Sequence, residues 1–186
     1  MKHKMNKWLI ITTSREPSRR TRSFIKDLVL AVPHSIKFNR GKFTLDDLRR
    51  IVINKGAYGL LMIYEKKANP SALVYYEISG TELKRTYLLK ITSIKLGREI
   101  REYQKPLGIK SLVIGTPNIG EGLPTHAVEA LVKIFKPSLY QNRPPQRSIE
   151  VVVVGDSSGL LVSFICTSSE RPCGPTFKIT GVKRYE

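Results

Sequence analysis

The stretch from Trp8 to Leu30, WLIITTSREPSRRTRSFIKDLVL, decides the fold that we predict for this chain. Its first part, Trp8 to Ile11, is a short apolar run with β-branched residues, which is typical of a buried strand. Thr12 to Ser18 is polar and contains Pro17, which indicates a loop. From Ser18 onward the apolar residues recur every three or four positions, so an amphipathic helix is expected to follow the strand and loop.

The start of this predicted helix is unusually basic. Ser18 is the expected N-cap, because its hydroxyl can accept a hydrogen bond from a free N–H group of the first turn. The cations that follow at spacings of four, three and four residues are Arg15, Arg19, Arg22 and Lys26, with Arg20 alongside. A helix N-terminus disfavours each exposed cation by up to about 1 kcal/mol. We therefore predict that a phosphate binds among these side chains and the N–H groups; the alternative is a solvated basic face.

The charge of the whole chain favours a polyanionic partner. The 186 residues carry a net charge of +17 and a pI near 10.1, which points to nucleic acid or an anionic membrane surface. Residues 1–110 hold 24 Lys and Arg against 9 Asp and Glu, whereas residues 111–186 hold 8 against 6. A heat-stable surface rich in ion pairs would carry matching acids, and the first part lacks them. No apolar run reaches the roughly 20 residues that span a bilayer, so we expect a cytoplasmic protein without a membrane partner.

The rest of the chain alternates further strands and helices. Apolar runs and turn signals predict strands at residues 35–38, 58–64, 72–78, 83–91, 111–114, 149–154, 160–166 and 176–182, and helices at 44–54 and 124–135. Thr44 is the expected N-cap of the second helix, and Asp47 can complete a capping box. Residues 92–110 are expected to form a basic connector, and residues 138–147 a polar loop.

This order of elements indicates an internal duplication. WLIITTS at Trp8 and SLVIGTP at Ser111 each lead from a strand through a loop toward a helix, and a hairpin and a closing strand follow in both parts. The predicted fold class is α/β, with two pseudo-repeated halves at approximately residues 7–95 and 110–186, each a mixed β-sheet with packed helices.

The sequence offers no recognisable catalytic, metal or cofactor site. The loop from Gly115 to Gly122 lacks the Gly-Lys-Ser/Thr end of a P-loop, and Glu121 would repel a phosphate. Gly155 to Gly159 is a hairpin signal between two strands rather than a nucleophile elbow. The three histidines, His3, His34 and His126, form no zinc-binding pair. We therefore predict a protein that is not an enzyme and has no cofactor; an enzyme with a phosphate-containing substrate at the Gly115 loop is a further alternative.

The cysteines and the aromatic residues can each be interpreted in two ways. Cys166 and Cys173 are too few for a zinc site, and we interpret them as a small core hydrophobe and a loop thiol, with a single disulfide as the alternative. Aromatic residues near the basic stretch could stack on bases, and they are Trp8, Phe24, Phe38 and Phe43. Trp8 and Phe24 are expected in the core instead.

Two blocks of the sequence resemble a known family. TTSREPSRRTRSFIKDL at residues 12–28 and NRGKFTLDDL at residues 39–48 are similar to the opening signature of the Brix-domain family of ribosome-biogenesis proteins, in particular its short, single-domain archaeal members. The resemblance implies two pseudo-repeats, each similar to the anticodon-binding domain of some tRNA synthetases. The rest of the chain fits mainly in length and in the order of its elements.

The resemblance also implies a function. It predicts an RNA-binding assembly factor that acts in ribosomal RNA processing, with ribosomal RNA or its precursor as partner and with ribosomal or assembly proteins as further partners. The expected RNA-binding residues are Ser14, Arg15, Arg19, Arg20, Arg22, Lys26, Arg40 and Lys42. The alternative is a tRNA-binding, anticodon-domain-like module that acts in trans.

Overall fold

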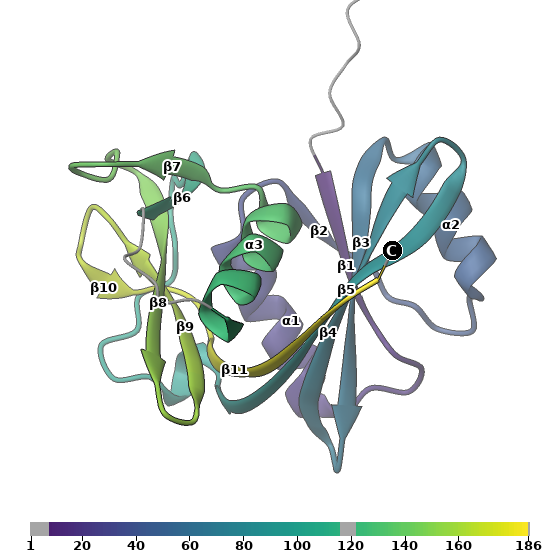
Figure 1. Ribbon diagram of the computed structural model, residues 1–186, viewed down its shortest axis with the longest axis horizontal. Helices are drawn as coiled ribbons and strands as arrows, with labels where there is room; N and C mark the ends of the chain where they lie inside the picture. The colour runs from purple at the N-terminus through teal and green to yellow at the C-terminus, as the bar shows by residue number, and fades with distance from the viewer. Residues whose placement is uncertain (1–7, 116–121, 186) are drawn as a thin grey trace, which may run out of the picture.

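The computed structural model describes residues 8–115 and 122–185, and its strands form one large mixed sheet (Figure 1). In chain order the elements are β1 (Trp8–Thr13), α1 (Arg19–Ala31), β2 (Ser35–Lys37), α2 (Leu45–Asn54), β3 (Ala57–Lys66), β4 (Asn69–Ser79), β5 (Glu82–Lys95), the short turn η1 (Gly97–Glu99), β6 (Ser111–Gly115), α3 (Leu123–Phe135), β7 (Ser138–Tyr140), β8 (Ser148–Asp156), β9 (Gly159–Cys166), β10 (Arg171–Pro172) and β11 (Thr176–Arg184). The predicted mixed α/β architecture is confirmed.

The strand order reads β2-β1-β3-β4-β5-β11-β9-β8-β6-β7, and β10 pairs with β9. At one end β1 runs parallel to both β2 and β3, and at the other end β6 runs parallel to both β7 and β8. The remaining pairs are antiparallel, including the pair of β5 with β11, which joins the two sides. Long strands β5 and β11 thus hold both sides of the molecule in one sheet.

The expected helix starts are confirmed. Ser18 caps α1 by accepting a hydrogen bond from the Thr21 N–H, at 3.2 Å from nitrogen to Oγ. Thr44 and Asp47 form the capping box of α2, in which each side chain bonds the backbone N–H of the other residue. Gly56 follows α2 with a φ of 60°, a left-handed conformation that glycine adopts without a steric penalty.

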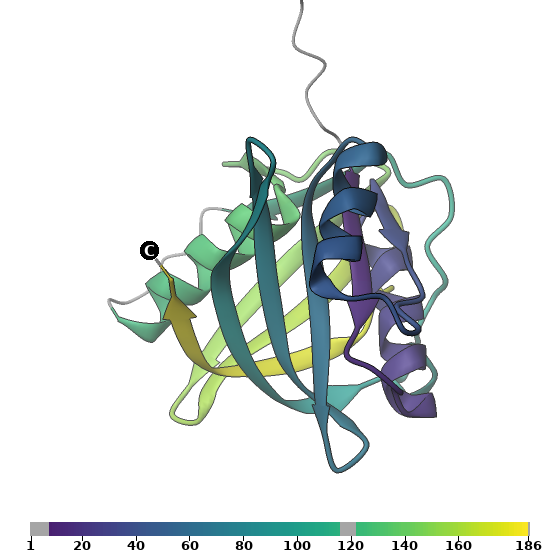
Figure 2. The ribbon, with the colours of Figure 1, turned by 90° about the vertical axis from the view of Figure 1, so that its right-hand side faces the viewer.

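The three helices cover the sheet unequally. Figure 1 shows α1 and α3 between the two sides of the sheet, and Figure 2 shows α2 on the outer face beside β3. On the inner side, Phe24 of α1 meets Phe177 of β11 edge to face, with ring centroids 5.9 Å apart, and the Tyr58 hydroxyl donates to the Ile134 carbonyl of α3 at 2.8 Å. On the outer side, the fully buried Leu48 and Val52 of α2 belong to a second apolar cluster.

Several expectations about the elements are corrected. Residues 138–140 lie in the short strand β7 rather than in a loop, and residues 171–172 form β10. Both are too short to leave an alternating pattern and exist because a neighbouring strand pairs with them. Strand β5 runs to Lys95, so the first residues of the expected connector belong to the sheet.

Cys166 and Cys173 form a disulfide, so their interpretation as a core hydrophobe and a loop thiol is wrong. Their Cα atoms lie 5.7 Å apart. The pairing of Arg171 with Cys166 in strands β10 and β9 folds the chain back and brings the two side chains together in the core. That pairing is a tertiary feature, which explains why the spacing of the two cysteines did not reveal it.

Candidate nucleic-acid interface

The first turn of α1 holds a carboxylate of the protein itself. Glu65, at the end of β3, accepts hydrogen bonds from the Ser18 backbone N–H at 3.0 Å and from the Ser18 hydroxyl at 2.8 Å. The Thr21 hydroxyl also donates to this carboxylate. Glu65 thus satisfies the N–H group of the N-cap, and the Ser18 hydroxyl satisfies that of Thr21. Binding of an external phosphate at this end of α1 stays a prediction.

These contacts keep Glu65 charged. Burial alone would raise the pKa of its carboxyl, but the hydrogen bonds from Thr21 and Ser18, together with the nearby Arg22, outweigh burial and lower the pKa. The negative charge offsets part of the cost of placing cations at a helix N-terminus. Glu65 thus stabilises the basic loop and helix from the inner side.

Four of the predicted cations are exposed on the loop before α1 and on its first turns. They are Arg15, Arg19, Arg22 and Lys26. Within residues 8–115 and 122–185, none of the four forms a direct ion pair. Ser14 is half-buried, and its backbone N–H donates to the Ile63 carbonyl at 2.8 Å, which fixes the loop to the end of β3. The four side chains can therefore contact a polyanion without first breaking an ion pair.

Arg20 differs from these four cations. Its guanidinium donates to the Glu99 carboxylate at 2.8 Å and to the Ile94 carbonyl at 2.8 Å. The hydrogen bond to Glu99 raises the pKa of Arg20, and the same bond lowers the pKa of Glu99. Arg20 therefore ties α1 to the turn after β5, and the structure does not place it among the free cations.

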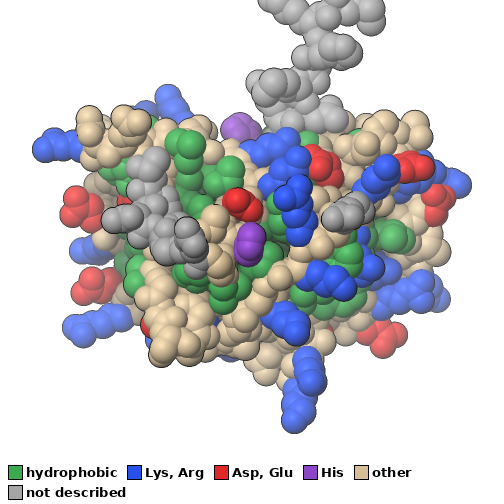
Figure 3. Space-filling model, viewed as in Figure 1, with side chains coloured by type: hydrophobic (Ala, Val, Ile, Leu, Met, Phe, Trp, Pro, Cys, Tyr) green, Lys and Arg blue, Asp and Glu red, His purple; other side chains and the backbone are tan. Residues whose placement is uncertain are grey.

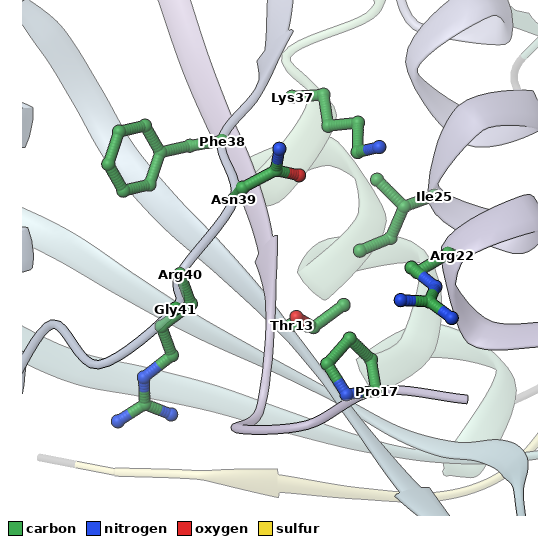
Figure 4. A pocket seen from close by; sticks show the side chains of 9 residues that line it. All are labelled: Thr13, Pro17, Arg22, Ile25, Lys37, Phe38, Asn39, Arg40 and Gly41. Carbon is green, nitrogen blue, oxygen red and sulfur yellow. The ribbon is translucent and has the colours of Figure 1, made fainter. Parts of the chain in front are cut away.

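The second predicted block lies beside the first, but its arginine turns away. The Thr12 hydroxyl donates to the Phe38 carbonyl at 2.7 Å, so the loop after β2 is fixed against β1. Arg40 donates from Nε to the Phe43 carbonyl at 3.3 Å, and in Figure 4 its guanidinium points away from Arg22. Lys42 is exposed on the same loop. Arg40 and Lys42 thus extend the basic surface rather than closing around one anion.

A hollow of about 300 Å³ separates α1 from the loop after β2 (Figure 4). Its lining residues are Thr13, Pro17, Arg22, Ile25, Lys37, Phe38, Asn39, Arg40 and Gly41. Sequence reasoning missed Thr13, Lys37 and Asn39, although each lies in or next to one of the two quoted blocks. The single sequence held no signal for them, because they are brought together by the parallel pairing of β1 with β2, which places the carboxyl ends of both strands side by side.

A second group of cations lies at the seam of α3 and the end of β11. Figure 3 shows Lys and Arg side chains gathered there. Lys133 pairs with Glu77 at 2.8 Å, while the Arg85 guanidinium carbon and the Lys183 Nζ lie 4.2 and 4.9 Å from the Tyr185 ring centroid. Sequence reasoning missed this group because its cations come from three elements, α3, β5 and β11, that are separate in the sequence.

The aromatic residues near the loop divide into two kinds. Phe24 is fully buried, as expected, so it is not available for stacking. Trp8 is 42% exposed and meets His34 edge to face at 5.8 Å, so the expectation that it lies in the core is wrong. Phe43 is 44% exposed and packs against Phe38 at 5.6 Å.

Metal centres and membrane spans are features of other protein classes that the described residues lack. Across the described part of the chain, no group of three or more His, Cys, Asp or Glu residues is arranged to hold a metal ion. No helix in that part combines the length and apolar character needed to cross a bilayer. Most of the Gly115 to Gly122 loop, considered above as a nucleotide site, lies outside the described residues.

The chain is an α/β protein with a basic loop and helix start exposed at its surface. Comparisons with known proteins narrow this class of protein further. No protein-family model matches the chain. The chain is 29% identical over 173 residues to a probable Brix domain-containing ribosomal biogenesis protein of Aeropyrum pernix, covering 91% of this chain and 93% of that one. A protein of the same description from Pyrobaculum aerophilum is 41% identical over 91 residues, about half of each chain.

Two solved structures of archaeal proteins are similar to this chain over most of its length. A crystal structure of a probable ribosomal biogenesis protein from Aeropyrum pernix K1 matches with a TM-score of 0.79 at 26% identity, over 93% of this chain and 95% of that one. Mil, an archaeal Imp4-like protein, matches in fold with a TM-score of 0.64 at 17% identity, over 95% and 99% of the two chains. The resemblance to the archaeal Brix-domain proteins is therefore confirmed over nearly the whole chain.

Proposed function

We propose that this chain is a non-enzymatic, cytoplasmic assembly factor that binds ribosomal RNA or its precursor during maturation of the ribosome. The contacts are made by Arg15, Arg19, Arg22 and Lys26 on the loop and α1, with Lys42 and Arg40 at the edge of the surface and Ser14 fixing the loop. One observation carries the proposal: Arg15, Arg19 and Arg22 are exposed around a helix start where cations are electrostatically unfavourable, and none of them has a direct ion pair among the described residues.

Two further facts support this proposal. The net charge of +17 favours a polyanion, and the cations responsible lie mainly in residues 1–110. The relatives over nearly the whole chain carry the description of ribosomal biogenesis proteins. Arg20 is bound to Glu99 and contributes by orienting α1 rather than by touching RNA.

We further infer that the chain arose by internal duplication, with halves at approximately residues 7–95 and 110–186, each anticodon-binding-domain-like. The strand orders β2-β1-β3-β4-β5 and β7-β6-β8-β9-β11 support this reading, because parallel and antiparallel pairs occur in the same sequence in both. The second half, which is less basic, then provides a surface for ribosomal or assembly proteins.

The experiment that tests this function is crosslinking of the protein to RNA in its native cells, followed by sequencing of the bound RNA. We expect reads concentrated on one region of ribosomal RNA, including sequence across a precursor boundary. Reads concentrated on tRNA would contradict the proposal and favour the tRNA-binding module instead. Reads spread evenly over cellular RNA would show a general affinity for polyanions and would also contradict it.

A further inference from the structure

We propose that the hollow between α1 and the loop after β2 is a pocket for one unpaired nucleotide of the bound RNA. This inference rests on the proposed function and deepens it, since it names the part of the RNA that the basic surface recognises. It differs from simple phosphate binding, because a pocket that takes a base distinguishes an extruded nucleotide from a regular duplex.

The walls of the hollow come from three elements that meet at the end of β1 (Figure 4). Arg22 and Ile25 of α1 form one side, and Lys37 at the end of β2 and Asn39 of the loop that follows form the other. Thr13 lies between them at the end of β1. The two sequence blocks at residues 12–28 and 39–48 therefore meet at this hollow. Neither block forms the hollow alone.

Polar groups in this hollow are free to bind a ligand. In the part of the chain that the structure describes, the side chains of Thr13, Lys37 and Asn39 make no hydrogen bond or ion pair with another residue. Arg22 is exposed and lacks a direct ion pair there as well. Two cationic groups, one amide and one hydroxyl thus converge without partners.

The arrangement of these groups matches the parts of a nucleotide. Arg22 and Lys37 carry the charges for a phosphate, while Pro17 provides apolar surface for a base. The Asn39 amide can both donate and accept a hydrogen bond, as the edge of a base requires. A volume of about 300 Å³ lies at the lower end of the range for small-ligand pockets, which suits one nucleotide rather than a helix.

The hollow is held open by contacts that do not involve its free groups. The Thr12 hydroxyl binds the Phe38 carbonyl at 2.7 Å, and the Phe38 N–H donates to the Ile11 carbonyl at 2.9 Å. The Phe38 ring turns toward Phe43 and away from the hollow. A preformed pocket of this kind loses little conformational entropy when it binds.

The test compares hairpin RNAs that differ only in the base of a one-nucleotide bulge. The full chain is titrated with fluorescent hairpins whose bulge carries A, C, G, U or an abasic residue, so that all five have the same number of phosphates. For at least one base we expect binding about tenfold tighter than for the abasic hairpin, because stacking and polar contacts to one base contribute on the order of 1–3 kcal/mol. Asn39→Leu and Thr13→Val should reduce this ratio to near one.

Asn54→Leu is the matched control, because Asn54 is an exposed asparagine at the end of α2. It should keep the wild-type ratio, and thermal unfolding of each variant checks that it folds. If the wild-type protein binds none of the four base-carrying hairpins more tightly than the abasic hairpin, the pocket proposal is wrong. In that case, salt-dependent binding of the hairpins would leave the proposed function standing, whereas no binding of any hairpin would overturn both.

Discussion

Helices α1 and α3 follow strands β1 and β6, which hold the same position at the two ends of the sheet, yet they carry their cations at opposite ends. In α1, Arg19 and Arg22 stand in the first turn, and no acidic residue does. In α3, Lys133 lies in the last turn and Lys136 is the C-cap. The helix dipole favours cations at a C-terminus and disfavours them at an N-terminus, so only the placement in α3 follows from stability.

The way in which each helix is supported shows the same difference. The start of α1 is bonded to Glu65 from β3, which offsets the cations around it. At the end of α3 the cations themselves have partners, since Lys133 pairs with Glu77 at 2.8 Å and Lys136 lies 3.9 Å from the ring centroid of Tyr58. From this comparison we infer that the cations of α1 serve a ligand, while those of α3 also serve the fold.

The largest expected effect is on RNA affinity. Replacing Arg15, Arg19 and Arg22 together by Gln should weaken binding of a ribosomal RNA fragment by about a hundredfold at moderate salt and reduce the magnitude of the slope of log affinity against log salt by about 3. The matched variant replaces Lys133, Lys136 and Lys183 by Gln and should lose far less. Equal losses in filter-binding titrations of the two triple variants would contradict the distinction between the helices.

The next largest effect is on the stability of the second half of the chain, which contains the disulfide. Reducing the disulfide between Cys166 and Cys173 should lower the free energy of unfolding by about 2.5 kcal/mol, because the unfolded chain regains the freedom of a short loop. Denaturant unfolding with and without a reductant measures this loss. A variant with alanine at both positions should not respond to the reductant. Unfolding curves of the wild type that do not respond either would show that the bond is absent.

A smaller effect is expected at the start of α1. Glu65→Gln should lower the free energy of unfolding by about 1–2 kcal/mol at neutral pH, because the hydrogen bonds from Ser18 and Thr21 lose their charged acceptor. The pKa of Glu65 is lower in the folded state, so its contribution is present above the unfolded pKa of about 4.3 and is lost as the pH falls through the folded pKa.

The difference between wild type and Glu65→Gln should therefore shrink below about pH 4. Chemical denaturation at a series of pH values checks this, with Glu82→Gln, at an exposed residue on β5, as the control. A difference that stays constant from neutral to acid pH would show that the carboxylate charge does not stabilise the helix start.

The smallest effect separates two arginines of the same helix. Arg20→Gln should cost about 0.5–1 kcal/mol of stability, because it removes a partly exposed ion pair with Glu99. Arg20→Gln should reduce RNA affinity less than Arg22→Gln does. Arg22→Gln, in turn, should leave the free energy of unfolding nearly unchanged. Thermal unfolding and RNA titration of both single variants test this, and the reverse pattern would assign the RNA contact to Arg20.

Much of the fold could be predicted from the sequence because its signals are local. Ser18, Thr44 and Asp47 marked helix starts by side-chain chemistry that acts within one turn, and the apolar runs marked the long strands. The short strands β7 and β10 and the disulfide could not be found in this way. They depend on which strand lies alongside, and a single sequence does not contain that information.

The candidate site was predicted in composition but not in arrangement. The spacing of Arg15, Arg19, Arg22 and Lys26 gave the correct exposed face, because helix periodicity decides it. The inward carboxylate of Glu65 comes from a strand 47 residues from Ser18, and Arg20 is held by an acid 79 residues away. Lys37 and Asn39 join the site only because β1 and β2 are neighbours in the sheet.

The measurement that tests the central claim most directly is the mapping of RNA-crosslinked peptides. The protein, bound to ribosomal RNA from its own cells, is irradiated, digested and analysed by mass spectrometry. The account predicts nucleotide adducts in the peptides that span Ser14 to Lys26 and Lys37 to Lys42. Adducts confined to α3 and β11, with none in the first loop and helix, would contradict it.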